Sequence, residues 1–303
     1  MRRGSWFRAL VASPQGAFGV GWLALVVAVA VVSRFWTPRD PFATDPYTAW
    51  APPSPAHLFG TDSVGRDIFS YVAAGSATTV VVALCAGVVA LVVGVSLAAL
   101  GSLTSRWVRE SVSVLIDILI AFPTVLIAMA LAAAFGGSLA VVVVAAGTGY
   151  GVNMARVSRA EIRRVGREDY VLAARAAGVG SIGVLRRHLL PNVAPVFAVQ
   201  LSLAMATSLL AEAGLSFLGY GASAETASWG RLLSDLQKFI GVHPWTVVWP
   251  GAAITLTVLA FNLLGDAVRD AGDPRLRRRP RRPSPAAPTA TAGTDTDRPG
   301  VVS

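Results

Sequence analysis

Long stretches without any charged residue dominate the hydrophobic pattern of the chain. No Asp, Glu, Lys or Arg occurs over residues 68–105, 118–155 or 239–265. A membrane-spanning helix needs about 20 consecutive apolar residues, so the first stretch is long enough for one span and the second for two. A transmembrane β-barrel would instead show alternating segments of about ten residues, which the sequence lacks. We therefore predict an all-α, polytopic membrane protein with about six transmembrane helices.

The ends of the apolar runs set the boundaries of these spans. The first run continues to Phe35 and Trp36, and aromatic residues suit a membrane interface. We therefore favour an uncleaved first span over 16–36, after an N-terminal segment of residues 1–15, although Ala28–Ala30 resembles a signal-peptide cleavage site. The other spans are predicted near 76–101, 112–134, 138–155, after Pro191 to about 218, and 245–265. An external, Pro-rich loop occupies 37–74, a transmembrane domain 75–272, and a tail 273–303.

Basic residues are distributed unevenly around these spans. The chain is 54% apolar and 14% charged, with a net charge of +9, whereas soluble domains carry about 25% charged residues. With six spans and a cytoplasmic N-terminus, 21 of the 26 Lys and Arg residues fall on the cytoplasmic side. This asymmetry follows the positive-inside rule, so the charge indicates topology and contact with anionic membrane lipid or acidic partner surfaces, not with nucleic acid. The tail, 273–303, has almost no large apolar side chain and is predicted to be disordered, basic and cytoplasmic.

The sequence carries no recognisable catalytic pattern. His57, His188 and His243 lie in separate predicted loops, and no cluster of His, Cys and carboxylate residues has metal-ligand spacing. The phosphate-binding pattern G-x-x-x-x-G-K-[ST] is also absent. We therefore predict no metal site, no cofactor and no enzymatic activity in this chain, and any ATP that drives it must bind to another protein.

The segment 156–192 is the most charged interior part of the chain, with eight arginines against three carboxylates. It contains the alanine-rich run 173–177, which favours a helix. Gly178 is placed to end that helix, because glycine accepts a positive φ. Small side chains let another surface approach closely. The segment is therefore either a docking helix for a partner protein or a solvated basic loop before the span that starts at Pro191.

Several motifs in this order resemble one known family. Tyr170-Val171, the alanine run to Gly178 and Arg187-His188-x-Leu-Pro-Asn192 resemble the EAA loop of the integral-membrane permease subunits of bacterial ABC importers. Segments 60–67, 117–123 and 211–219 further resemble the C-type subunit of the dipeptide/oligopeptide/nickel branch. The resemblance covers roughly residues 5–274, with one departure: Leu172 stands where the family has the glutamate that names the loop.

The resemblance implies the fold and the partners of a type I ABC importer permease. It implies a second permease subunit, two ATPase subunits that bind ATP and Mg, and an extracytoplasmic solute-binding protein. Such a complex imports dipeptides or oligopeptides across the bacterial cytoplasmic membrane, with nickel or a glutathione-like solute as the alternative. A self-contained secondary transporter is less favoured, because the sequence shows no matching halves. The residues implied to couple to the ATPase are Ala173, Ala174, Arg175, Ala176, Gly178, Arg187, Pro191 and Asn192.

Two carboxylates, Asp117 and Glu212, lie within predicted spans. A carboxylate in hydrocarbon is costly and is expected to face a protein interior or an aqueous cavity. These two side chains either line the translocation path or make buried structural hydrogen bonds at the subunit interface. Pro123 is predicted to kink the third span, because proline lacks the backbone N–H that a regular helix needs.

The external loop contains three charged residues close together, Asp62, Arg66 and Asp67. Two interpretations are open. The residues either contact the solute-binding protein, or they form a self-contained turn in which Arg66 pairs with a carboxylate.

Overall fold

The computed structural model describes residues 10–103 and 106–272. Within them, five helical segments are long and apolar enough to cross a membrane, and a bent helix pair makes a sixth span if it is counted as one. The prediction of about six spans is therefore confirmed. The main helices are α2 (Pro14–Val32), α3 (Ile68–Leu103), α6 (Leu139–Val165), α9 (Leu190–Phe217) and α11 (Val248–Gly272). The predicted tail, 273–303, lies outside the described residues.

The bent pair consists of α4 (Arg106–Ala121) and α5 (Thr124–Phe135), whose axes differ by 79°. The break falls at Phe122 and Pro123. Proline disfavours the helical conformation at the residue before it and cannot donate a backbone hydrogen bond. Pro123 has extended backbone angles, φ −60° and ψ 121°, and α5 begins at the next residue. The predicted kink is thus a complete break between two helices.

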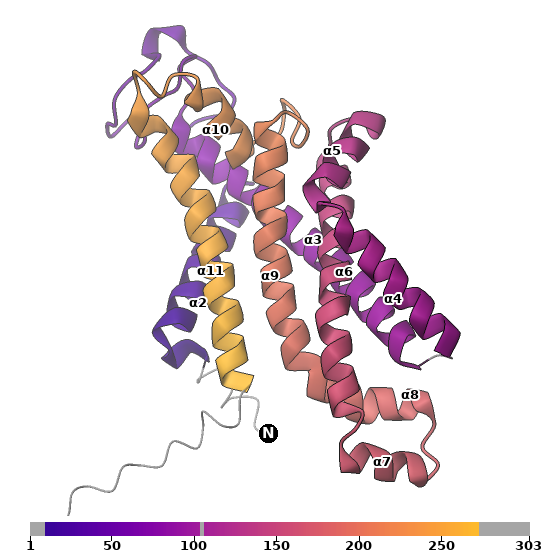
Figure 1. Ribbon diagram of the computed structural model, residues 1–303. Coiled ribbons are helices and arrows are strands. Elements are labelled where there is room, and N and C mark those ends of the chain that lie inside the picture. The colour runs from indigo at the N-terminus through magenta and orange to yellow at the C-terminus, as the bar shows by residue number, and fades with distance from the viewer. Residues whose placement is uncertain (1–9, 104–105, 273–303) are drawn as a thin grey trace, which may run out of the picture. The chain divides into compact units, whose positions relative to one another are not determined.

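The connecting segments gather at two ends of the helices. The short helices α7 (Asp169–Ala176) and α8 (Ser181–Val184) lie at one end, where α2 begins and α11 ends (Figure 1). The loop 37–67 and the short helix α10 (Trp229–Gln237) lie at the opposite end. We refer to these as the α7 end and the α10 end.

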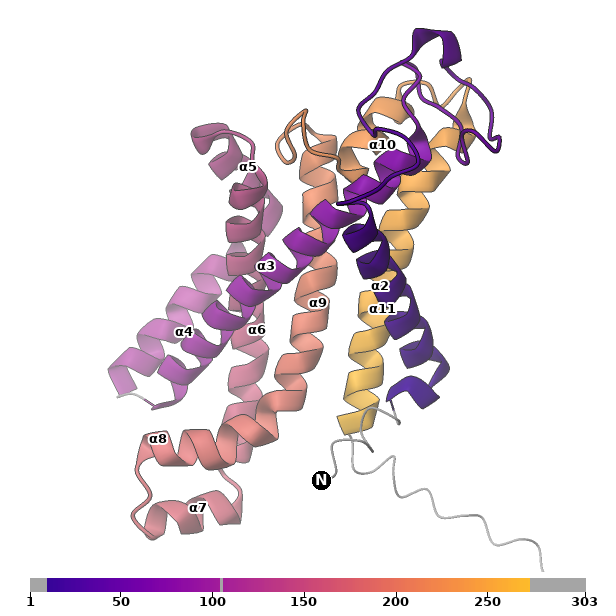
Figure 2. The same cartoon turned by 180° about the vertical axis from the view of Figure 1, so that it is seen from behind.

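Glycines allow α3 and α6 to pack closely. Gly147 and Gly151 of α6 are four residues apart, the spacing of small residues at tight helix contacts in membranes. A Cβ at Gly147 would lie 2.9 Å from the backbone oxygen of Ala86, and one at Gly151 would lie 2.8 Å from that of Ala90. Figure 2 shows α3 running obliquely across α6 and α9. The two glycines therefore fix where α3 crosses α6.

Helix α2 packs against α11, on the opposite side of α9 from α6 (Figure 1). Val26 and Ile254 belong to one buried cluster, and the indole Nε1 of Trp22 donates a hydrogen bond of 3.1 Å to Thr257 Oγ1. These contacts support the interpretation of the first run as a retained span. The first span was predicted over 16–36, but the helix ends at Val32. Phe35 and Trp36 therefore lie just past its last residue.

Several helices extend past the charged residues that delimit the apolar runs. Residues 156–165, predicted as the start of the loop, are the last turns of α6. Arg164 pairs there with Glu161 at 2.6 Å, and pairs three or four residues apart support a helix. The other end of the predicted loop is also helical from Ser181, through a π-helical turn, Leu185–Leu189, into α9. These bounds correct the predicted loop 156–192: the charges mark where the apolar surface stops, not where the helices stop.

The external loop is likewise shorter than the predicted range 37–74, because α3 begins at Ile68. Asp67 precedes that helix and its Oδ2 accepts a hydrogen bond of 2.8 Å from the backbone N–H of Ser70. A side-chain oxygen in this position caps the free N–H groups of a helix start. Asp67 therefore sets the beginning of α3.

Candidate coupling and translocation sites

Helix α7 carries the predicted coupling residues on an exposed surface. The side chains of Ala173, Arg175 and Ala176 are exposed, and that of Ala174 is half-buried. The helix is anchored from beneath by Val171, which is fully buried in a cluster with residues of α6 and α9. Leu172, at the position of the family glutamate, is 50% exposed. An anchored helix with a surface of small side chains suits close contact with another protein.

Gly178 ends this helix as predicted. Its φ of +82° is in the left-handed region, which glycine adopts without strain. The N–H of Gly178 donates to the oxygen of Arg175, and the N–H of Val179 donates to that of Ala174. These two bonds form a Schellman motif, which satisfies carbonyls left free at the helix end. A Cβ at Gly178 would have no neighbour within 4 Å, so the position faces open space.

The remaining predicted coupling residues lie beside α7. Arg187 is exposed on the π-helical turn, and Pro191 and Asn192 are exposed at the start of α9. The rings of Tyr170 and His188 lie 6.1 Å apart and join the start of α7 to that turn. Asn192 donates a side-chain hydrogen bond of 2.6 Å to the backbone oxygen of His188. The structure therefore gathers the predicted residues at the α7 end.

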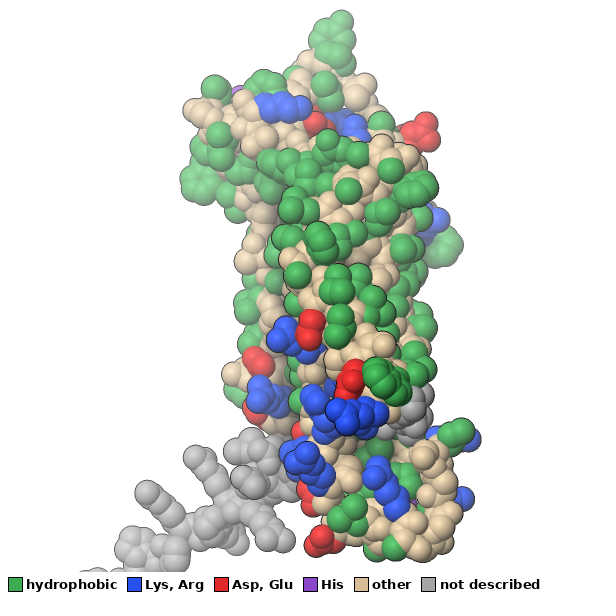
Figure 3. Space-filling model, turned by 45° about the vertical axis from the view of Figure 1, so that its right-hand side comes forward, with side chains coloured by type: hydrophobic (Ala, Val, Ile, Leu, Met, Phe, Trp, Pro, Cys, Tyr) green, Lys and Arg blue, Asp and Glu red, His purple; other side chains and the backbone are tan. Residues whose placement is uncertain are grey.

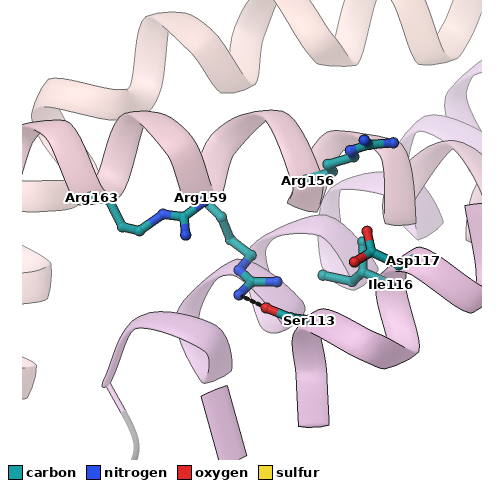
Figure 4. A pocket seen from close by; sticks show the side chains of 6 residues that line it. All are labelled: Ser113, Ile116, Asp117, Arg156, Arg159 and Arg163. Carbon is teal, nitrogen blue, oxygen red and sulfur yellow. Dashed lines mark hydrogen bonds between the residues drawn. The ribbon is translucent and has the colours of Figure 1, made fainter. Parts of the chain in front are cut away.

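Asp117 lies in a basic environment on α4. It lines a cavity of about 250 Å³ with Ser113 of the same helix and with arginines of α6 (Figure 4). Arg159 reaches across from α6 and donates a hydrogen bond to Ser113 Oγ. Sequence reasoning missed this cavity, because Arg156, Arg159 and Arg163 were assigned to a loop. Their spacing on one face of a continued α6 is the signal that was available.

Glu212 lies in a different environment, where α9 meets α10. Its side chain is 1% exposed, and its Oε1 accepts hydrogen bonds from Ser216 Oγ at 2.7 Å and from Ser228 Oγ at 2.8 Å. Ser228 is the N-cap residue of α10. Glu212 and Asp117 share neither a partner nor a described cavity. The geometry of Glu212 matches the structural interpretation of that carboxylate.

The charged residues of the external loop hold one another. Asp62, 1% exposed, accepts a bond of 2.7 Å from Arg66 Nε, and Arg66 Nη2 reaches Asp235 of α10 at 3.3 Å. Asp67 lies 3.0 Å from His57 Nδ1. Burial opposes the charge of Arg66, but the two carboxylates outweigh this effect and raise the pKa of the guanidinium. The predicted pairing of Arg66 with a carboxylate is thus present, but the turn is not self-contained, because Asp235 belongs to α10. Contact with a binding protein stays a prediction.

Comparison with known proteins decides the family. A sequence model of the family described as binding-protein-dependent transport system inner membrane component matches residues 90–278. The chain belongs to this family. The permease is 34% identical to the dipeptide transport system permease protein DppC of Alkalihalophilus pseudofirmus, over 271 residues and 89% of each chain. The predicted resemblance is therefore confirmed.

Two further relatives show the breadth of the group. The permease is 33% identical over 254 residues to the nickel transport system permease protein NikC of Escherichia coli K12, covering 84% of this chain and 92% of NikC. It is 32% identical over 256 residues to the oligopeptide transport system permease protein OppC of Bacillus subtilis, covering 84% of each. The chain is thus an ABC importer permease of the peptide/nickel family, a multi-pass membrane subunit of a transport system.

Proposed function

We propose that this permease translocates dipeptides or oligopeptides and is driven by two separate ATPase subunits that dock on α7. It pairs in this proposal with a second permease subunit and receives its substrate from an extracytoplasmic solute-binding protein. Both termini and α7 face the cytoplasm. The observation that carries the proposal is the exposed, Schellman-capped helix α7, held between α6 and α8.

The mechanical argument rests on how α7 is attached. Val171 is 0% exposed and Val184 of α8 is 1% exposed, and both belong to the buried cluster that contains residues of α6 and α9. A push on α7 is therefore transmitted to two long helices through packed side chains. Packed cores move as units between discrete arrangements. This attachment suits a helix that converts ATPase motion into a change of access.

Gly178 provides the test of coupling. Gly178→Leu places a bulky side chain into the open space at the helix end and strains the positive φ. We expect the variant to insert into the membrane but to lose co-purifying ATPase subunits and ATP-driven uptake. Gly178→Asn also adds a side chain, but asparagine adopts the left-handed backbone conformation more readily than leucine. Comparison of the two variants therefore separates the effect of backbone strain from that of a side chain that blocks docking.

Gly241→Leu is the control for the added side chain, because Gly241 lies in the segment that follows α10 and has no neighbour within 4 Å of an added Cβ. It is expected to keep both association and uptake. Normal uptake by the Gly178→Leu protein would contradict the coupling role of α7.

The substrate is proposed from the relatives named for dipeptide and oligopeptide transport. Nickel is the second candidate, because NikC is similar over 84% of this chain, and a glutathione-like solute is a third. Uptake by the whole transporter of a labelled dipeptide, of labelled nickel and of glutathione distinguishes the three. Uptake of nickel without peptide would overturn the peptide assignment and leave the ATPase coupling intact.

A further inference from the structure

Arginines of three elements line two adjoining cavities near the α7 end. The first cavity, about 250 Å³, lies between α4 and α6 and contains Arg156, Arg159 and Arg163. The second, about 430 Å³, shares Arg163 and adds Arg109, Arg167 and Arg175. Asp117 is the one carboxylate in either lining. The two cavities therefore concentrate positive charge well beyond what their own acidic group offsets.

Arg159 is the cavity arginine whose burial calls for an opposite charge. Its side chain is 6% exposed, yet its hydrogen-bond partner in the described part of the chain is the neutral hydroxyl of Ser113. Figure 4 shows its guanidinium directed from α6 toward α4, with Asp117 further along α4. Burying a charge is costly unless an opposite charge or several hydrogen bonds accompany it. The first cavity thus sets one carboxylate, Asp117, against three arginines, so part of its positive charge has no counter-charge in the lining.

The carboxylates on α4 and at the end of α6 that lie outside the cavity linings are already engaged. Glu161 and Glu168 both pair with Arg164, which is not in the lining of either cavity. Glu110 pairs with Arg106 at 2.8 Å. These nearby acids are therefore not the counter-charges of the cavity arginines.

The surface next to the cavity is apolar. On α4 the side chains of Val114, Leu115 and Ile118 are 58%, 46% and 53% exposed, and Trp107 near its start is 81% exposed. Figure 3 shows the apolar surface of this face giving way to basic side chains, which are arginines, toward the α7 end. Aromatic residues and arginines at the edge of an apolar band are typical of the headgroup level of a membrane. A ligand in the cavity therefore meets both positive charge and an apolar face.

We propose that the cavity between α4 and α6 binds the phosphate of an anionic membrane lipid, whose acyl chains lie along the apolar face of α4. Guanidinium groups match phosphate oxygens with paired N–H donors. Arg159 and Arg163 supply these donors from within the cavity, and the adjoining arginines attract the headgroup. The proposal concerns a lipid site and does not depend on the transported substrate.

Native mass spectrometry of the full-length chain tests it, after exchange into micelles that contain phosphatidylglycerol or phosphatidylcholine. We expect the wild-type chain to retain phosphatidylglycerol preferentially. The double variant Arg159→Gln/Arg163→Gln is expected to lose that retention about tenfold or more, because the loss of even one of its two charge-assisted contacts has about a tenfold effect. Arg163→Gln alone, at an exposed position of α6, tests the same site if the double variant folds poorly.

Arg164→Gln is the matched control for Arg163→Gln, because it also removes one positive charge, at the next residue of α6 and outside the cavities. It is expected to keep the lipid preference. An equal loss in this control and in the cavity variants would overturn the site and leave only general attraction to a basic surface. Displacement of the lipid by inorganic phosphate at a concentration no higher than that of the lipid would overturn the lipid as the source of the phosphate. Loss of the bound lipid when the whole transporter assembles would also overturn the proposal. It would mean that carboxylates of a neighbouring subunit, and not a lipid phosphate, pair with the cavity arginines.

Discussion

At the scale of single residues, Glu212 shows how a buried carboxylate can serve structure in a transport protein. One oxygen of Glu212 accepts from both Ser216 of α9 and Ser228 at the start of α10. Ser216 Oγ in turn accepts from the backbone N–H of Ala222 in the loop between them. The carboxylate therefore fixes the path of the chain from α9 to α10 rather than presenting a free charge to a solute.

We predict that Glu212→Ala destabilises the protein by about 1–3 kcal/mol, because it leaves buried hydroxyls without their acceptor. Glu212→Gln keeps an acceptor oxygen and is expected to cost less. Thermal unfolding in detergent measures both, with the exposed Glu225→Ala as the control. Loss of uptake in Glu212→Ala at unchanged stability would instead assign the residue to the translocation path.

Residue types alone predicted part of what the external loop contains. The close spacing of Asp62 and Arg66 was enough to suggest a local ion pair, which the structure contains. The second partner, Asp235, lies 169 residues further along the chain. No local pattern indicates such a contact, because it depends on how α10 folds back over the start of α3.

At the scale of helices, the sequence predicted which segments span the membrane better than where the helices end. An apolar run shows the part of a helix that lipid or core surrounds. Helix α6 continues to Val165 because its polar last turns are stabilised by ion pairs and by their own propensity. The 79° break at Pro123 was foreseen as a kink, but its size depends on the packing of α5 against α6.

The sequence did not predict which helices contact one another. Gly147 and Gly151 can be recognised in the sequence as a small-residue motif, but the sequence does not indicate which helix packs against them. We predict that Gly151→Leu destabilises the protein by about 1–3 kcal/mol, since its Cβ would lie 2.8 Å from the oxygen of Ala90. The fraction of protein that stays monodisperse after heating in detergent measures the effect.

Gly251→Leu provides the comparison for that variant. Gly251 lies in α11, also a spanning helix, and an added Cβ there would meet nothing within 4 Å. The substitution is expected to be tolerated. Equal losses from both variants would mean that the glycines act through the helix backbone and not through the α3–α6 contact.

At the scale of the whole molecule, the two ends of the described helices differ in the chemistry that they carry. The α7 end holds the arginine-lined cavities and the capped helix α7, whereas the α10 end holds the clamp of Arg66 with Asp62 and Asp235. The described basic residues that were counted on the predicted cytoplasmic side lie at the α7 end, and the others counted on that side lie outside the described residues. The positive charge of the described residues is therefore concentrated at the end where α6 finishes and α7 lies.

We expect this basic α7 end to face the cytoplasm, and labelling of single cysteines measures the orientation. In a Cys85→Ala background we predict that Tyr47→Cys, at a fully exposed residue of the α10 end, reacts with a membrane-impermeant maleimide in intact spheroplasts. Ala176→Cys, on the exposed surface of α7, is expected to react only after permeabilisation. The positive-inside rule is the physical reason, because basic segments are retained on the cytoplasmic side during insertion. The reverse pattern would invert the topology and remove α7 from the side where ATP is available. Labelling of both positions from outside would instead reduce the number of spans between them to an even number.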